Sequence, residues 1–150
     1  MNAKATADAI AALFTNKTAT VGTTTESLTA ATASLPNTIA KGPILLVYHP
    51  TGVLEVGVSK IRADELDFPV RILRDPTDYP TRSDWLYAWY NATRDVIEAD
   101  LDLGLAYVAW ASPISTRIEL DGQSYAKVPF DVVEFIVRVH YYEVVTTVSA

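Results

Sequence analysis

The chain has 150 residues, no cysteine, and 18 acidic against 12 basic side chains, which gives a formal net charge of -6. A chain of this length suits a single domain that buries its core without cross-links, and the missing thiols exclude disulfides and thiolate metal sites. An acidic balance is opposite in sign to the surface of a nucleic-acid-binding protein and argues against sequence-specific DNA binding. The apolar run from Ile10 to Phe14 is too short for a signal sequence, and nothing approaches a membrane span of about 20 residues. We therefore expect synthesis in the cytoplasm and no membrane partner.

The N-terminal quarter of the chain divides into a helix and a polar arm. The alanine-rich segment from about Ala3 to Thr15 predicts a short amphipathic helix. Its expected apolar stripe is Ala5, Ala9, Ile10, Leu13 and Phe14. Over residues 15–42 Thr, Ala and Ser predominate, and we expect a flexible arm of the single domain 1–150. The alternative for the arm is that a partner chain orders it, and both arrangements are compatible with a short helix from Thr25 to Ser34.

Three strands are expected after the arm. The apolar run from Ile44 to Tyr48 has the composition of a buried strand, and apolar residues alternate with polar ones from Leu54 to Val58. Because Pro50-Thr51-Gly52 separates the two, the pattern predicts a hairpin between them. Alternation resumes from Leu66 to Leu73 and predicts a half-buried strand. Its expected apolar face is Leu66, Phe68, Val70 and Ile72.

An aromatic helix follows this strand, and the two form the segment around which we expect the fold to be organised. The prolines between Asp75 and Pro80 predict a turn. Thr81, with Asp84 three residues later, predicts the N-cap of a helix that begins near Arg82. Apolar residues then recur at three- and four-residue spacings, which is typical of a helix that lies on a sheet. They are Trp85, Leu86, Trp89, Tyr90, Thr93, Val96 and Ile97.

Two further strands are expected from Leu105 to Ala111 and from Ile114 to Leu120. Asp121-Gly122 favours the positive φ angles of a type I′ turn, so it predicts a hairpin that folds the second strand onto Gln123 to Lys127. Such a hairpin projects beyond the sheet and is a candidate for docking onto another protein.

The last strand has large side chains on both faces. One face holds Val133, Phe135, Val137, Val139 and Tyr141, and the other holds Ile136, His140 and Tyr142. Phe130 and Val132 have the opposite parity to the main apolar face, which predicts a β-bulge or bend near Val132. A strand of this kind needs a cover on both faces, and two helices of one subunit cover only one.

Candidate catalytic groups are limited to carboxylates. They cluster at Asp64, Glu65 and Asp67, and again at Asp95, Glu98, Asp100 and Asp102, where a helix is expected to expose them to solvent. The only histidines, His49 and His140, are far apart in the sequence. The sequence has no nucleophile elbow, phosphate loop or dinucleotide motif. We therefore expect a protein without enzymatic activity, metal or cofactor.

An interface with other protein chains is better supported by these patterns than a catalytic site. The last strand has large side chains on the face of Ile136, His140 and Tyr142, and Tyr87 lies toward the polar side of the central helix. Aromatic residues are enriched at protein interfaces. The candidate interface residues are Tyr87, Glu119, Asp121, Gly122, Ile136, His140 and Tyr142.

The order of these elements is similar to that of a known family. The order begins with a short helix, a variable arm, Leu35-Pro36 and a strand pair. It continues with Arg62-Ala63-Asp64 leading into Phe68 to Leu73, a capped helix, Gly122-x-x-Tyr125 and strands ending in Tyr142-Glu143. Over most of the chain this order resembles the tail terminator proteins of long-tailed bacteriophages (siphophages), and the adjacent head-tail connector proteins look similar. The resemblance implies an α+β fold, with two main helices on one face of a curved antiparallel sheet.

The resemblance also implies a role and partners. The protein would be a structural component of the virion, made in the host cytoplasm, whose hexameric ring caps the tail tube and joins tail to head. Its partners would be further copies of itself, the tail tube protein, the head-tail connector protein, and DNA that passes through without sequence-specific binding. An acidic lumen suits such passage because like charge does not hold the phosphate backbone. The alternatives are another neck protein (connector or head completion protein), a monomeric binding module, and a small enzyme that uses the carboxylates from Asp64 to Asp67.

Overall fold

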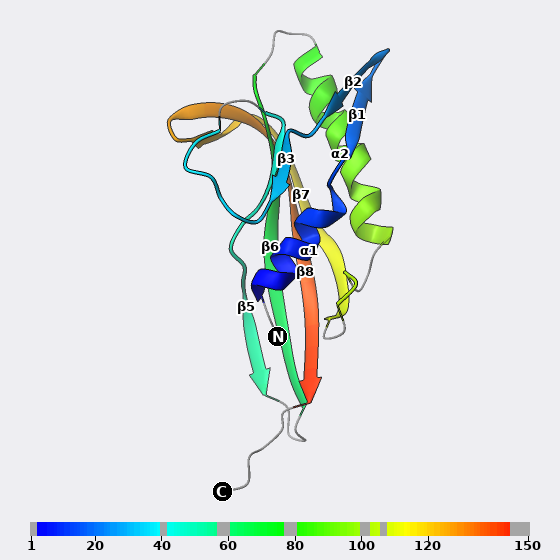
Figure 1. Ribbon diagram of the computed structural model, residues 1–150, viewed down its shortest axis with the longest axis vertical. Helices are drawn as coiled ribbons and strands as arrows, with labels where there is room; N and C mark the ends of the chain where they lie inside the picture. The colour runs from blue at the N-terminus through cyan, green and yellow to red at the C-terminus, as the bar shows by residue number, and fades with distance from the viewer. Residues whose placement is uncertain are drawn as a thin grey trace, which may run out of the picture.

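The computed structural model describes residues 3–39, 42–56, 61–76, 81–99, 103–105 and 108–144, and this part of the chain has an α+β fold (Figure 1). The elements in chain order are α1 (Ala3–Leu13), β1 (Thr18–Val21), β2 (Thr24–Ser27), β3 (Ala30–Thr32), β4 (Ile44–Val47), β5 (Thr51–Val56), β6 (Ile61–Arg74), α2 (Thr81–Ala99), β7 (Val108–Tyr125) and β8 (Val128–Val144). A six-stranded sheet has the order β3-β4-β6-β8-β7, with β5 also paired to β6, and β1 and β2 form a separate two-stranded sheet. All pairs are antiparallel except β3 with β4.

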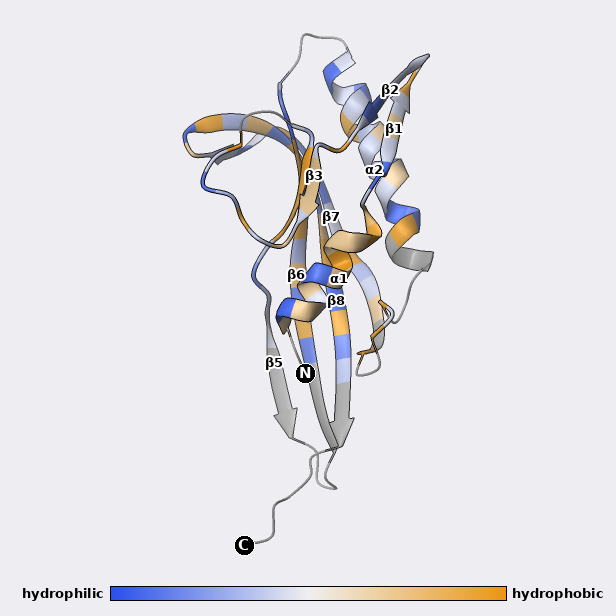
Figure 2. Ribbon diagram, viewed as in Figure 1, coloured by the Kyte–Doolittle hydropathy of each residue, from blue (hydrophilic) through white to orange (hydrophobic). Residues whose placement is uncertain are grey.

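The long strands β6 and β8 form the centre of the sheet. They pair without a register shift from Ile61 opposite Val144 to Arg74 opposite Asp131. Apolar and polar residues alternate along both strands, as the colours in Figure 2 show, and the apolar set lies on one face. The buried members of that face are Phe68, Val70 and Ile72 in β6 and Val133, Phe135, Val137, Val139 and Tyr141 in β8. The expected apolar faces of both strands are therefore confirmed, except that Leu66 is only half-buried.

Both helices pack on this apolar face, which confirms the expected layers (Figure 1). In α2 the side chains of Trp85, Leu86, Trp89 and Thr93 are buried, as their spacing predicts, and the helix begins at Thr81. Burying an aromatic side chain as large as Trp89 contributes roughly 1.5–3 kcal/mol or more to folding. Helix α1 is confirmed, but its buried side is rotated from the expected stripe and comprises Thr6, Ala7, Ile10 and Ala11, with Phe14 just beyond.

The expected hairpin between Ile44–Val47 and the following strand is wrong. Strands β4 and β5 both pair with β6, one after the other along the same edge, from Ile44 opposite Leu73 to Val56 opposite Arg62. The chain at 48–50 therefore does not reverse direction. Between the pairs Val47–Val70 and Thr51–Asp67, this edge contains one residue more than β6 does. The amide of Tyr48 still donates to the carbonyl of Pro69 at 2.8 Å, so the interruption is a bulge that Pro50 accommodates.

The flexible arm expected at 15–42 is also wrong for the described residues, and residues 25–34 form parts of two strands instead of a helix. Strands β1 and β2 form a hairpin beside α2, and β3 extends the main sheet (Figure 1). The carboxylate of Glu26 fixes the hairpin: Trp89 Nε1 donates to Oε1 at 2.8 Å, and Arg74 donates to both oxygens at 3.0 and 3.1 Å. Ala19 is buried in the main core. Threonine favours strands, so the composition that suggested a disordered arm is compatible with strands once a surface is available to pack on.

The C-terminal third contains one long strand, β7, where two strands and a hairpin were expected. Asp121 and Gly122 lie in an irregularity of β7 between Glu119 and Gln123, and the chain reverses at Ala126 and Lys127, with φ of 49° and 69°. Two positive φ values in a two-residue connection are those of the primed hairpin turns, here adopted without glycine or asparagine. The Asp-Gly turn expectation is thus wrong, and the docking hairpin does not exist at that position.

Glycine at position 122 is needed for space. Its φ is not positive, and a Cβ added there would lie 2.9 Å from the Cβ of Glu119 and 3.1 Å from Val132 Cγ1. The bulge predicted near Val132 belongs to β7, opposite that residue, whereas β8 keeps its register with β6. Phe130 and Val132 are buried in a second cluster on the other face of the sheet, together with Ile39, Ile44, Leu46 and Leu73. The end of the β7–β8 hairpin is curled (Figure 1), and Tyr125 beside its turn packs against that cluster.

Candidate functional site

The predicted interface residues do not form one patch. Tyr87 is 59% exposed on α2, on the helix side of the sheet. Ile136 and His140 are half-buried on the opposite face, and Tyr142 lies beyond the described side chains. The sequence-based set is therefore divided between two sides of the molecule.

Glu119, Asp121 and Gly122 belong to the irregular part of β7 instead of a projecting turn. Asp121 accepts a hydrogen bond from Arg82 at 2.6 Å, and Glu119 pairs with Arg117 at 3.2 Å. Both carboxylates are thus engaged within the chain. The pairs are partly exposed, and exposed ion pairs are weak.

The sheet face opposite the helices bears paired charges on β6 and β8. Arg138 donates to Asp67 at 2.8 Å and lies 3.1 Å from Glu65, whose other oxygen is 3.4 Å from His140 Nδ1. Farther along the same face Arg71 pairs with Glu134, which also lies 3.8 Å from Arg117. Ile136 lies between these two groups of charges and is half-buried. The hydrogen bond to Asp67 raises the pKa of Arg138 above its usual value, so its charge persists.

This arrangement bears on the catalytic alternative. Glu65 and Asp67 both lie in β6 and both pair with Arg138 of β8, so their oxygens serve as ion-pair acceptors. The side chain of Asp64 lies outside the described residues, as do Glu98, Asp100 and Asp102, while Asp95 pairs with Arg94 at 3.1 Å. The described residues include no group of three or more side chains that could hold a metal ion. The enzyme hypothesis gains no support from this geometry.

A buried charge cluster links α2 to the β7–β8 hairpin, and the sequence pattern did not reveal it. Asp131 is fully buried; Arg82 donates to its Oδ2 from Nε at 2.7 Å and to its Oδ1 from Nη2 at 2.5 Å. The amide of Asp121 donates to Oδ1 at 2.9 Å. The bond to Asp131 raises the pKa of Arg82 above its ordinary value. An aspartate between the apolar residues Phe130 and Val132 was the available signal, because an unpaired carboxylate there would be costly.

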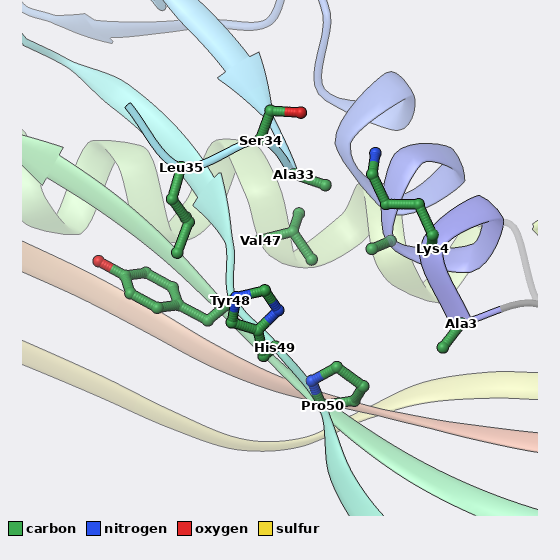
Figure 3. Close-up of a pocket in the computed structure, with 10 residues that line it drawn as sticks. Ala3, Lys4, Ala33, Ser34, Leu35, Val47, Tyr48, His49 and Pro50 are labelled. Atoms are coloured by element: carbon green, nitrogen blue, oxygen red, sulfur yellow. The ribbon is translucent and has the colours of Figure 1, made fainter. Parts of the chain in front are cut away.

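A pocket of about 410 Å³ lies between the start of α1, residues 33–35 and the bulge at 48–50 (Figure 3). Alkyl and aromatic groups form much of its wall, including Ala33, Leu35, Val47 and Tyr48. Lys4 and His49 also line it, but Lys4 pairs with Asp8 at 2.5 Å. None of the predicted interface residues contributes to this pocket. Its lining suits an apolar group better than a charged substrate.

Comparison with known proteins does not identify a family for this chain. No model of a known protein family matches the sequence, and no curated protein matches it either. Within the described residues, neither helix is long and apolar enough to cross a membrane.

Proposed function

We propose that this chain is a ring-forming structural protein of the neck of a long-tailed bacteriophage, acting as a tail terminator that caps the tail tube and joins it to the head. The observation that supports the proposal is the fold: a curved, mainly antiparallel sheet with both helices on one face. This is the arrangement that the resemblance to tail terminator proteins implies. The expected structural role and virion location rest on that resemblance.

The placement of the candidate interface residues also suits a ring. A ring closes through head-to-tail contacts, in which two different surfaces of one subunit meet its two neighbours. Tyr87 on the helix side and Ile136 with His140 on the opposite face provide two such surfaces. The paired charges around Ile136 would fix the orientation of a neighbour more than they would add affinity.

The overall charge is compatible with DNA passing through the ring. With a formal net charge of -6, the chain supplies no general attraction for phosphates. A lumen with this balance would let DNA move without adhering. Another neck protein, such as a connector or a head completion protein, would share these features.

The test is the mass and shape of the assembly. We expect light scattering and negative-stain electron microscopy to show a cyclic hexamer, either for the protein alone or after addition of the tail tube protein encoded in the same genome. Tyr87→Glu should weaken the ring without changing the circular dichroism spectrum, whereas Asn91→Glu, an exposed change one turn along α2, serves as the control. A monomer at every concentration, with and without the tube protein, would refute the proposal.

A further inference from the structure

The outer edge of β7 lies beside α2, and we call the space between residues 113–119 of this edge and the helix the groove. Strand β7 is the last in the order of the sheet, and in the part of the chain that the structure describes its only strand partner is β8. Helix α2 packs against β7 and β8. The free backbone edge of a strand therefore lies next to a helix, which is a combination that can receive an extended peptide.

A small cavity opens between the two elements. It has a volume of about 240 Å³ and is lined by Tyr90 and Arg94 of α2 and by residues 113–116 of β7. That volume is below the range of typical small-molecule pockets, so a single side chain is a better fit. Ile114, which lies in the lining, is 44% exposed, and Tyr87 on the neighbouring turn of α2 is 59% exposed.

Beside this cavity, β7 has a regular stretch between two interruptions of its pairing. Register shifts occur between Pro113 and Ser115 and again between Glu119 and Gln123, and bulges and proline are devices that prevent edge pairing. Between them, residues 115–119 stay in step with β8. A short stretch of β7 can thus accept another strand between these two interruptions.

The cavity wall contains a stacked aromatic ring and one arginine. The ring of Tyr90 stacks on Phe135, with centroids 5.7 Å apart and an angle of 12° between the planes. Arg94 is the charged residue of the lining, and it lies 5.9 Å from the Tyr90 ring centre. Its ion pair with Asp95 is exposed, and exposed ion pairs contribute little to stability.

We propose that this groove binds an extended segment of a partner protein, which adds a strand to residues 115–119 of β7, places an apolar side chain in the cavity beside Ile114, and sets a carboxylate against Arg94. The strand supplies affinity through backbone hydrogen bonds, and the cavity with its arginine supplies the preference for an apolar residue next to an acidic one. Tyr87 would cover the bound segment from the helix side. This inference does not depend on the assignment to a phage neck.

The probe is a displayed library of random linear peptides selected against the full chain. We expect a consensus with an apolar residue next to Asp or Glu. The labelled consensus peptide should lose about tenfold or more in affinity for Ile114→Arg and for Arg94→Glu, as expected for interface anchors. Val128→Arg is the matched control, because Val128 is 46% exposed and lies outside the groove; it should change affinity by less than about twofold.

Strand addition has its own readout. A consensus peptide methylated on alternate backbone nitrogens keeps its side chains but loses donors, so it should bind about tenfold or more weakly. Bound peptide should also slow amide hydrogen exchange at residues 115–119. Absence of any consensus, or binding unaffected by Ile114→Arg, overturns the proposal. Concentration-dependent dimerisation of the free chain that Ile114→Arg abolishes would overturn it too, because the edge would then belong to a second copy.

Discussion

Replacing Asp131 by alanine is expected to lower the free energy of unfolding by roughly 3–5 kcal/mol. The carboxylate is fully buried and accepts three hydrogen bonds, two from Arg82 and one from the amide of Asp121. Its removal leaves a guanidinium and a backbone N–H without their buried acceptor, and each such loss costs more than an ordinary hydrogen bond contributes. One side chain thereby connects the start of α2, the irregular part of β7 and the centre of the sheet.

The measurement is urea unfolding followed by tryptophan fluorescence, which the three tryptophans allow. The midpoint should fall while the slope of free energy against urea stays constant, since the change affects the native state and not the exposed area. Asp121→Asn is the matched control: its side chain is 59% exposed and bonds the same arginine, so the loss should be no more than about 1 kcal/mol.

A double variant separates charge burial from loss of packing. Arg82→Met combined with Asp131→Leu removes both charges together, so it should be destabilised less than the sum of the two single changes. If the free energy of unfolding of Asp131→Ala is within about 1 kcal/mol of that of the parent, the cluster is not a buried ion pair in solution and the reasoning fails.

Three other substitutions test separate features. Glu26→Ala should cost roughly 2–4 kcal/mol in urea unfolding, because it frees the β1–β2 hairpin from Trp89; an unchanged midpoint would mean that the hairpin does not pack on α2. Gly122→Ala should cost about 1–3 kcal/mol, because the new Cβ meets Glu119 and Val132; equal stability would show that the bulge relaxes freely. Burial, and then the nearby Tyr48, raises the pKa of Tyr125, so its contribution to stability is present below the ordinary tyrosine pKa and is lost as pH rises through the raised value. Absorbance titration should show a late tyrosine that Tyr125→Phe removes; no difference between the two curves would contradict the burial argument.

The elements with strong periodicity were predictable from sequence. In α2 the spacing of Trp85, Leu86 and Trp89 determines which side is buried, and in β8 the alternation from Val133 does the same. Both patterns arise because one side of the element packs against a single continuous core, and hydrophobic periodicity identifies that side. The presence of two helices on one sheet face follows directly from them.

The errors arose where a local signal competed with a distant partner. Asp121-Gly122 has the local chemistry of a turn, but a buried Asp131 accepts the amide of Asp121 and holds the pair within β7. The turn formed instead at Ala126 and Lys127, which have no strong turn signal of their own. In the same way Glu26 orders the β1–β2 hairpin through Arg74 and Trp89, which are far away in sequence. No window of neighbouring residues contains such information.

The groove beside β7 could not be predicted either. Pro113 and Ile114 are an unremarkable pair in the sequence, and only the pairing of β7 with β8 and the position of α2 bring Tyr90 and Arg94 beside them. Tyr87 was recognised as exposed, but its relation to a strand edge depends on tertiary structure.

The central position of β8 has a consequence for how the protein is made. Of the described strands it is synthesised last, yet it lies between β6 and β7 and pairs with both along most of their length. While a ribosome is still adding residues 128–144, the segments of α1, α2 and the first strands have already been synthesised, but β6 lacks its partner on one edge and Phe68, Val70 and Ile72 lack their neighbours in β8. Chains grow at roughly 5–20 residues per second, so this exposed state lasts for seconds in each nascent molecule. Crowded synthesis therefore exposes one specific edge, that of β6, to pairing between unfinished chains until the final strand enters the sheet.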